Sequence, residues 1–218
     1  MSVDRLILFL IQYSFFLVAA AVHESSHAWS ANKLGDPTAK YQNRISLNPA
    51  NHIDIIGTVM IPFFVFLSGV PVIGWARPTP VNPANFANPR RDGMLVSAAG
   101  PVSNLLAAVM LTGLYHLVAA LFHPEYFLIP RLFCYVFAVG IIVNLMLAVF
   151  NMLPIHPLDG SGVLEGILPE AWADAYARMR PYGFIILLVL FYLPGFQGII
   201  GMAVRFLLRM LGMPAYGF

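Results

Sequence analysis

The chain has 218 residues, of which 59% are hydrophobic and only 10% are charged, with a formal net charge of +2. Soluble domains carry about 25% charged residues, so this composition excludes a soluble enzyme, a nucleic-acid-binding protein and a disordered adaptor. Several apolar runs reach the length that spans a bilayer, about 17 to 25 residues, and they predict a polytopic membrane protein. The only cysteine, Cys134, allows no intrachain disulfide.

The first apolar run covers residues 6–22, and we expect its helix to continue to Leu34, where Gly35-Asp36-Pro37 stops it. Such a helix is longer than a hydrocarbon core of about 30 Å, so its last turns should leave the bilayer or bend within protein. A cleaved secretory signal ending at residues 19–21 is the rival interpretation. Its basic region would be the single Arg5, which disfavours it.

Residues 38–47 alternate between polar and apolar side chains, except at Asn43, and therefore predict a β strand or hairpin at the membrane surface. Residues 53–73 are apolar but interrupted by glycine and proline, so they either span the membrane or re-enter it. Residues 94–122 and 132–153 are predicted spans. Residues 182–211, split by Pro194-Gly195, form a span or a hairpin.

The expected fold class is an all-α polytopic membrane protein, a bundle of about four to six transmembrane segments with this small β element after the first helix. The positive-inside rule favours re-entry of residues 53–73, because the basic residues of the first half then share one face, which would be cytoplasmic. These residues are Lys33, Lys40, Arg44, Arg77, Arg90 and Arg91.

The segment His23-Glu24-Ser25-Ser26-His27 is the most informative stretch. Histidines four residues apart share a helical face, so both imidazoles can bind one ion, and nitrogen ligands suit zinc. Glu24 lies about 100° around the helix, where it can take a proton from a water that zinc activates. Chance and packing are the alternative explanation, but ionisable groups at membrane depth are costly and mark functional sites.

A catalytic zinc takes three protein ligands and keeps one position open, so a third ligand must come from elsewhere in the chain. Asp159 is the strongest candidate. Prolines break the preceding helix, and Gly160 permits an unusual backbone angle that could turn the carboxylate back toward the bundle. The other interpretation of Asp159 is a cap for a helix that starts near Ser161.

These two segments together resemble the site-2 protease family, the zinc metalloproteases that cut within membranes, in its short bacterial form without a PDZ or CBS domain. The resemblance covers nearly the whole chain up to about Leu168, and its motifs stand in the family's order. They are the His-Glu-x-x-His helix, residues 34–40, Leu47-Asn48-Pro49 with His52-Ile53-Asp54, residues 74–78 with 80–83, Ala99-Gly100-Pro101 with Asn104, and residues 151–160.

The resemblance implies that His23, His27 and Asp159 bind one Zn²⁺ per chain, that Glu24 is the general base, and that Asn151 acts near the substrate carbonyl. The chain would then be one intramembrane metalloprotease domain, 1–218, with core motifs in residues 5–168. It would be a zinc-dependent endopeptidase in the bacterial cytoplasmic membrane, with a transmembrane protein substrate and the lipid bilayer as partners and no nucleic acid. Homo-oligomerisation is left open.

Several alternatives stay open from the residues. A divalent-metal transporter or channel could use the same ligands, a zinc-stabilised scaffold would have no turnover, and a protease of another family could use Glu165 or Glu170 as third ligand.

Asn151 could instead form an inter-helix hydrogen bond. Asn104 and Asn144 share that ambiguity, and His52 either supports a ligand or pins a loop. His116, His123 and His156 are not expected to bind the metal. We also expect the 38–47 strand to offer its edge to an unwound substrate.

Overall fold

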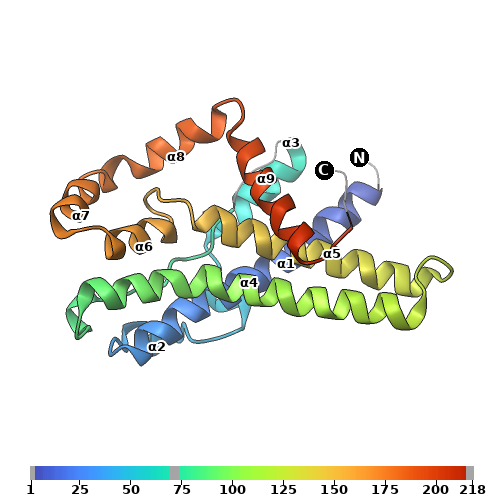
Figure 1. The fold of residues 1–218 in the computed structure, drawn as a ribbon, viewed down its shortest axis with the longest axis horizontal. Coiled ribbons are helices and arrows are strands. Elements are labelled where there is room, and N and C mark those ends of the chain that lie inside the picture. Colours follow the sequence, from blue (N-terminus) through green and yellow to red (C-terminus); the bar gives the residue numbers. More distant parts are fainter. Residues whose placement is uncertain (1–2, 69–73, 215–218) are drawn as a thin grey trace.

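The computed structural model describes residues 3–68 and 74–214, and every regular element within these ranges is helical. Three helices are long and apolar enough to cross a membrane, and they lie side by side in Figure 1. They are α1 (Val3–Lys33), α4 (Pro89–Phe122) and α5 (Leu128–Asn151). The end of α1, the start of α4 and the end of α5 therefore meet at one end of the bundle.

Helix α4 begins five residues before the predicted span because its first turn is capped rather than apolar. The Asn88 side chain accepts a hydrogen bond from the Arg91 N–H at 3.1 Å, and Pro89 occupies the first turn. At its other end, His123 adopts a left-handed conformation with φ 45°, which turns the chain back toward α5. The span was predicted from hydrophobicity alone, and a hydrophobic pattern does not include the capped first turn of the helix.

The bundle core combines alanines, which let α4 and α5 approach closely, with larger aliphatic side chains. Ala108 on α4 and Ala138 and Ile141 on α5 are 0%, 3% and 0% exposed. Helix α9 (Phe196–Met210) closes this core with Val204 and Leu208.

The C-terminal apolar segment is neither a straight span nor a closed hairpin. Helix α8 (Gly183–Tyr192) and α9 meet at an angle of 84° across a break that contains Gly195, whose φ is 92°. Glycine adopts this left-handed angle without steric cost. The described residues thus contain three candidate spans, below the four to six expected from sequence, or four if this bent pair counts as one, which is the lower limit of that range.

The segment predicted at residues 53–73 is helical where it is described. It begins with a π-helical turn, η2 (Ile55–Met60), and continues as α3 (Ile61–Ser68), while residues 69–73 lie outside the described residues. The Trp75 N–H donates to the Gly57 carbonyl at 3.2 Å, and the Thr58 hydroxyl donates to the Trp75 carbonyl at 2.9 Å. These contacts bring the start of the segment beside Trp75, as expected if the segment re-enters the membrane.

The predicted β strand at residues 38–47 is wrong, since no strand occurs in residues 3–68 or 74–214. Residues Thr38–Tyr41 form one helical turn, α2, and Asn43 ends it with a left-handed φ of 54°. Buried Asp36 starts this turn, because its carboxylate accepts from the Thr38 N–H at 3.1 Å. Arg44 points inward and is 3% exposed, so the alternating pattern does not define two faces. The proposed edge for a substrate is therefore absent.

Short elements complete the connections around this end of the bundle. The described ones are η1 (Pro49–His52), η3 (Pro83–Asn85), α6 (Asp159–Ile167), α7 (Glu170–Ala177) and η4 (Arg180–Tyr182). Asp36 ties two of the connections together. Its carboxylate accepts from the Asn82 N–H and from the Asn85 side chain, both at 2.7 Å.

Replacing Asp36 by asparagine should lower thermal stability in detergent at neutral pH. Burial by itself would raise the pKa of Asp36, but hydrogen bonds from Thr38, Asn82 and Asn85 outweigh it and hold that pKa below its ordinary value. The stabilisation is therefore complete above the ordinary carboxyl pKa and is lost as the pH falls through the lowered one. A loss of about 1.5–3 kcal/mol per charged hydrogen bond is the expected scale.

The melting temperature of Asp36→Asn, measured against wild type at about pH 7 and about pH 3, checks this expectation. The difference should be larger at the higher pH, and the exposed Asp174→Asn on α7 is the matched control with little effect at either pH. A difference of equal size at both pH values would show that the charge of Asp36 does not contribute.

Candidate metal centre

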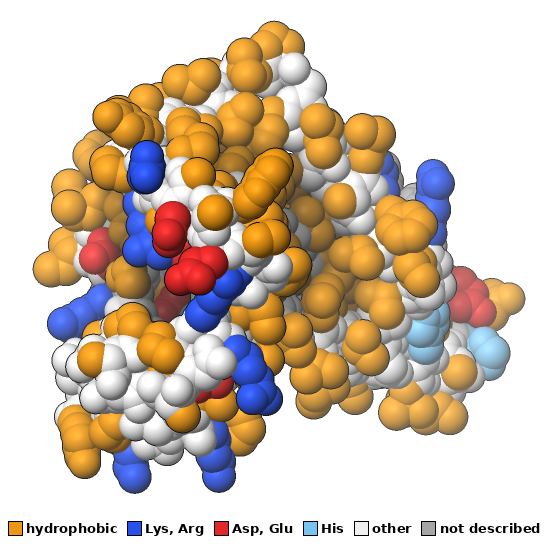
Figure 2. Space-filling view, turned by 60° about the vertical axis from the view of Figure 1, so that its left-hand side comes forward, with side chains coloured by type: hydrophobic (Ala, Val, Ile, Leu, Met, Phe, Trp, Pro, Cys, Tyr) orange, Lys and Arg blue, Asp and Glu red, His pale blue; other side chains and the backbone are white. Residues whose placement is uncertain are grey.

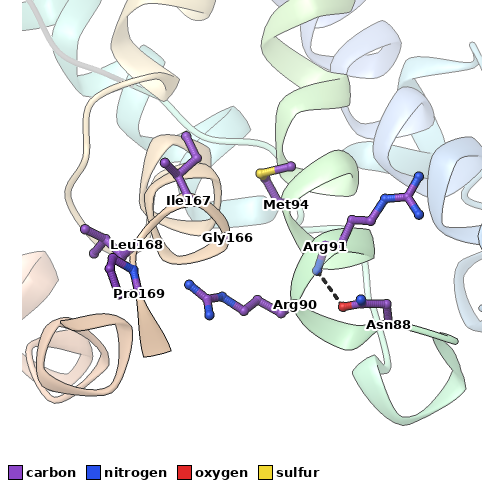
Figure 3. Close-up of a pocket in the computed structure, with 8 residues that line it drawn as sticks. All are labelled: Asn88, Arg90, Arg91, Met94, Gly166, Ile167, Leu168 and Pro169. Carbon is purple, nitrogen blue, oxygen red and sulfur yellow. Dashed lines mark hydrogen bonds between the residues drawn. The ribbon is translucent and has the colours of Figure 1, made fainter. Parts of the chain in front are cut away.

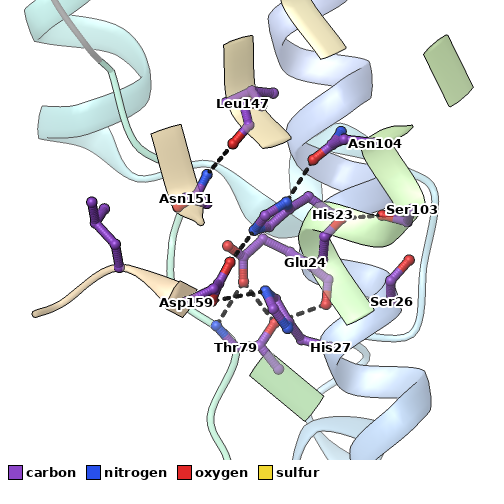
Figure 4. Close-up of polar contacts among 12 residues, drawn as sticks. His23, Glu24, Ser26, His27, Thr79, Ser103, Asn104, Leu147, Asn151 and Asp159 are labelled. Carbon is purple, nitrogen blue, oxygen red and sulfur yellow. Dashed lines mark hydrogen bonds and ion pairs between the residues drawn. The ribbon is translucent and has the colours of Figure 1, made fainter. Parts of the chain in front are cut away.

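The two motif histidines are buried in the last part of α1, one turn apart. His23 and His27 are 6% and 7% exposed, and their Nε2 atoms point toward Asp159 (Figure 4). His23 Nε2 lies 2.9 Å from Asp159 Oδ2, and His27 Nε2 lies 3.3 Å from Asp159 Oδ1. One ligand atom from each of the three residues lies within 4.8 Å of the others, which is compatible with one shared ion. Two imidazole nitrogens and a carboxylate oxygen are a donor set that zinc takes in proteins.

Both imidazoles are oriented by acceptors behind them. His23 Nδ1 contacts Asn104 Oδ1 at 2.6 Å, and His27 Nδ1 contacts the Val96 carbonyl at 2.7 Å, both on α4. An oxygen acceptor requires the Nδ1 proton, so each Nε2 is the nitrogen available to a metal. The Asn104 amide in turn donates to the Ala19 carbonyl at 3.1 Å and to Asn144 Oδ1 at 3.0 Å. Asn104 and Asn144 thus belong to an inter-helix network, in which Asn104 orients His23.

Asp159 reaches the histidines because the chain breaks between α5 and α6. Leu158 precedes α6 without a side-chain cap, and Asp159 is the first residue of that helix, so the capping alternative is not observed. Gly160 does not have a positive φ, and the expected unusual backbone angle is wrong. A glycine is needed at position 160 for a steric reason. A Cβ there would lie 2.5 Å from the Leu153 carbonyl oxygen and closer still to the Met152 carbonyl oxygen.

Gly100 gives the two histidines their space from the side of α4. A Cβ at this position would lie 2.6 Å from His23 Nε2 and even closer to His27 Nε2. Real Cβ atoms essentially never approach other atoms so closely. A glycine therefore leaves room beside the two nitrogens that would bind an ion, and the residues present fit a zinc site.

Glu24 is half-buried next to the histidines and is held by one residue of a distant loop. Its Oε2 accepts the Thr79 backbone N–H at 2.8 Å and contacts the Thr79 hydroxyl at 2.7 Å (Figure 4). The sequence interpretation did not single out Thr79, although the motif on either side of it was noted. The sequence feature that could have drawn attention to Thr79 is its position between two prolines, Pro78 and Pro80.

Known proteins similar to this chain agree with the chemistry of its donor set. It is 42% identical over 182 residues to "Putative zinc metalloprotease YwhC" of Bacillus subtilis (strain 168), covering 82% of this chain and 78% of that protein. It is 30% identical over 191 residues to "Putative zinc metalloprotease Rip2" of Mycolicibacterium smegmatis, covering 85% and 68%. The chain belongs to the site-2 protease family of zinc metalloproteases.

The Rip2 protein of Mycobacterium tuberculosis (strain H37Rv), whose printed name is the same, is 31% identical over 186 residues, covering 84% and 67%. No protein-family model matches the chain, and no solved structure matches it. Because its relatives are named as zinc metalloproteases and its long helices are apolar, this site-2 protease is a membrane-embedded metalloprotease that uses Zn²⁺.

Asn151 lies at the end of α5 and is drawn on the same side of the view as Asp159, across from α1, in Figure 4. Its amide donates to the Leu147 carbonyl at 3.0 Å, within its own helix. The expected alternative for Asn151, an inter-helix hydrogen bond, is not among its described contacts. One amide hydrogen of Asn151 is left for another acceptor, because the side chain has two.

The remaining histidines and glutamates do not join the metal-binding group. His52 is 2% exposed and its Nε2 contacts the Ser46 carbonyl at 2.7 Å, so it pins a loop. Glu165 lies 3.3 Å from His156 Nε2 and pairs with Arg180 at 2.5 Å. Glu170 is exposed at the start of α7. Neither Glu165 nor Glu170 is therefore placed to be the third metal ligand that a protease of another family would use.

A cavity of about 420 Å³ lies outside this centre, between the start of α4 and the end of α6 (Figure 3). It is lined by Asn88, Arg90, Arg91, Met94 and residues 166–169. None of the three metal-binding candidates lines it, so the zinc site is distinct from this hollow.

Proposed function

We propose that this metalloprotease hydrolyses peptide bonds in or near transmembrane segments of membrane proteins, as one domain over residues 1–218. The observation that carries the proposal is the position of the His23, His27 and Asp159 group. Two of its members lie on the membrane-length helix α1, the third lies at the start of α6, and the membrane-length helix α4 contacts both imidazoles. A soluble substrate would need no such arrangement. Residues 1–2, 69–73 and 215–218 of this domain lie outside the described residues.

In this mechanism His23, His27 and Asp159 would hold Zn²⁺, which would supply Lewis acidity for the attack of water on the peptide carbonyl. Glu24 does not belong to the group of possible ligand atoms, and it is fixed by Thr79 beside them. We assign it the general base that takes a proton during attack and returns it to the leaving amine. Asn151 would donate its second amide hydrogen to the carbonyl oxygen as negative charge develops there.

The distribution of charge supports a cytoplasmic location for the zinc end of the bundle. Figure 2 views the molecule from the side where α2, α6 and α7 lie, and charged side chains gather there, whereas hydrophobic side chains cover much of the remaining visible surface. Exposed Lys33, Lys40, Arg90 and Arg178 belong to this end. By the positive-inside rule this end faces the cytoplasm, so we place the protein in the bacterial cytoplasmic membrane as a multi-pass protein.

A membrane helix shields its peptide carbonyls by hydrogen bonds, so we expect a substrate to unwind locally before cleavage. At the helix ends water has a short path to Glu24 and Asp159, both of which are partly exposed. A metal transporter, the main rival, would use Glu24 as another ligand or not at all. The two hydrogen bonds from Thr79 to its Oε2 favour the protease.

Zinc content of the detergent-purified protein tests the site. We expect about one zinc per chain in wild type and near-complete loss in His27→Ala and in Asp159→Ala, because two remaining ligands bind zinc weakly. His123→Ala, whose side chain is 65% exposed at the far end of the bundle, and Asp174→Asn are matched controls that should keep the metal. Zinc retained in Asp159→Ala would show that the third ligand is another residue.

A further inference from the structure

Residues 75–82, which we call the strap, run past the metal centre as a non-helical segment. The strap is fixed along its length by other connections. Trp75 donates its N–H to Gly57, Arg77 donates its N–H to the His52 carbonyl at 2.9 Å, and Asn82 donates to Asp36. Because these partners come from three separate loops, the backbone of the strap has little freedom beside α1.

Arg44 gives the strap an additional, costly anchor. It is 3% exposed, and its guanidinium donates to the carbonyls of Asn51 and Arg77. Among the described residues no carboxylate forms an ion pair with it. Glu24 is close enough to attract this guanidinium electrostatically without pairing with it, and the two carbonyls supply hydrogen bonds that offset part of the cost of its burial. Arg44 therefore ties the strap at Arg77 to residue 51.

Two residues beyond Arg77, the strap brings both donors of Thr79 to Glu24. The single hydroxyl hydrogen is shared between Oε2 and the Glu24 backbone carbonyl, which lies 2.9 Å from the hydroxyl oxygen. The backbone N–H and the hydroxyl both lie within 2.8 Å of Oε2. Pro78 and Pro80 restrict the backbone on either side of Thr79. The N–H on Oε2, together with the hydroxyl that contacts both Oε2 and the Glu24 carbonyl, restricts rotation of the side chain, and no described residue donates to Oε1. That second oxygen is therefore directed by Thr79 and is available for proton transfer.

The geometry points to Thr79 as a positioning residue for Glu24, with Arg44 holding the strap that carries it. This inference rests on the proposed role of Glu24 as the general base. Thr79 acts through the carboxylate and not on zinc, so its hydroxyl should affect turnover more than substrate binding or metal content. A catalytic group displaced by about 1 Å can lose about 100-fold in rate, which sets the scale.

Thr79→Val and Thr79→Ser separate the hydroxyl from the shape of the side chain. The assay uses the full chain in phosphatidylcholine–phosphatidylglycerol vesicles, with a fluorogenic single-span peptide that wild type cleaves. Thr79→Val should lower kcat by about 10- to 100-fold with unchanged KM and zinc content, since only the backbone donor remains. Thr79→Ser, which keeps the hydroxyl, should restore kcat to within about threefold of wild type.

A double variant shows whether the effect passes through Glu24. If Thr79 acts only on this carboxylate, adding Thr79→Val to Glu24→Gln should cause no further loss of residual activity. Wild-type kcat in Thr79→Val, or equally low kcat in Thr79→Ser, would overturn the inference. A further loss in the double variant would do the same. Thr79→Ala, with the smaller side chain, should match Thr79→Val and excludes a packing effect of the second methyl group.

Failure of this inference is distinguishable from failure of the proposed function. If Glu24→Gln is inactive and Thr79→Val has normal kcat, Glu24 remains the base and only the role of Thr79 is wrong. If Glu24→Gln cleaves the peptide as wild type does, the base assignment itself is wrong.

Discussion

Replacing Glu24 by glutamine should abolish peptide-bond cleavage while one zinc per chain stays bound. Glutamine has the same shape and can still accept the Thr79 hydrogen bonds through its amide oxygen, but it cannot take up the proton that hydrolysis releases. General-base catalysis contributes about 10²- to 10⁴-fold, so kcat should fall by about 10³-fold or more. Zinc analysis and peptide cleavage on the same reconstituted sample provide the two measurements.

The matched control is Glu170→Gln, an identical chemical change at an exposed position of α7, which should leave both zinc and kcat unchanged. Loss of zinc in Glu24→Gln would contradict the assignment, because it would make Glu24 a ligand. That result would favour the metal-transporter alternative, in which the carboxylate belongs to a transit site.

The parts of the site that were predictable from sequence are those defined by local spacing. Histidines at positions 23 and 27 must share a helical face once α1 is a helix, and the apolar runs determine the long helices. Asp159 was predictable because few acidic residues follow a helix break. The structure then brings these three residues together, as expected.

The features that sequence reasoning missed or misread depend on distant partners. Alternation at residues 38–47 indicates a strand, yet Asp36 accepts hydrogen bonds from Asn82 and Asn85, and this network fixes a helical turn instead. Likewise, Thr79 has no local pattern that links it to Glu24, 55 residues earlier. Local periodicity cannot contain such contacts, because they arise only when separate loops pack together.

The residues of the proposed site come from three helices and one loop. Helix α1 supplies both histidines and Glu24, α4 orients the imidazoles through Asn104 and Val96, and the start of α6 adds Asp159. Each proposed ligand is therefore held by a regular helix, and only the proposed base, Glu24, is also held by a loop. Metal binding and catalysis should consequently respond to different substitutions, zinc content to changes on α4 and turnover to changes in the strap.

Gly100→Ala should remove zinc almost completely, although no ligand is changed. The added methyl group would lie 2.6 Å from His23 Nε2 and closer still to His27 Nε2, in the space beside both nitrogens. Backbone movement of α4 could relieve this overlap only by displacing Asn104 and Val96, which orient the same two imidazoles. Loss of such orienting contacts alone costs about 10- to 100-fold in metal affinity, and direct overlap adds to it.

Gly113→Ala makes the identical change in the same helix at a position where a Cβ meets nothing within 4 Å. It should keep one zinc per chain and gain about 1 kcal/mol in helix stability, because alanine is the better helix former. Zinc affinity measured by competition with a chelator should therefore fall in Gly100→Ala and stay constant in Gly113→Ala. Equal affinity in both variants would mean that zinc does not bind on the face of His23 and His27 that Gly100 adjoins, and the ligand geometry would have to be reassigned.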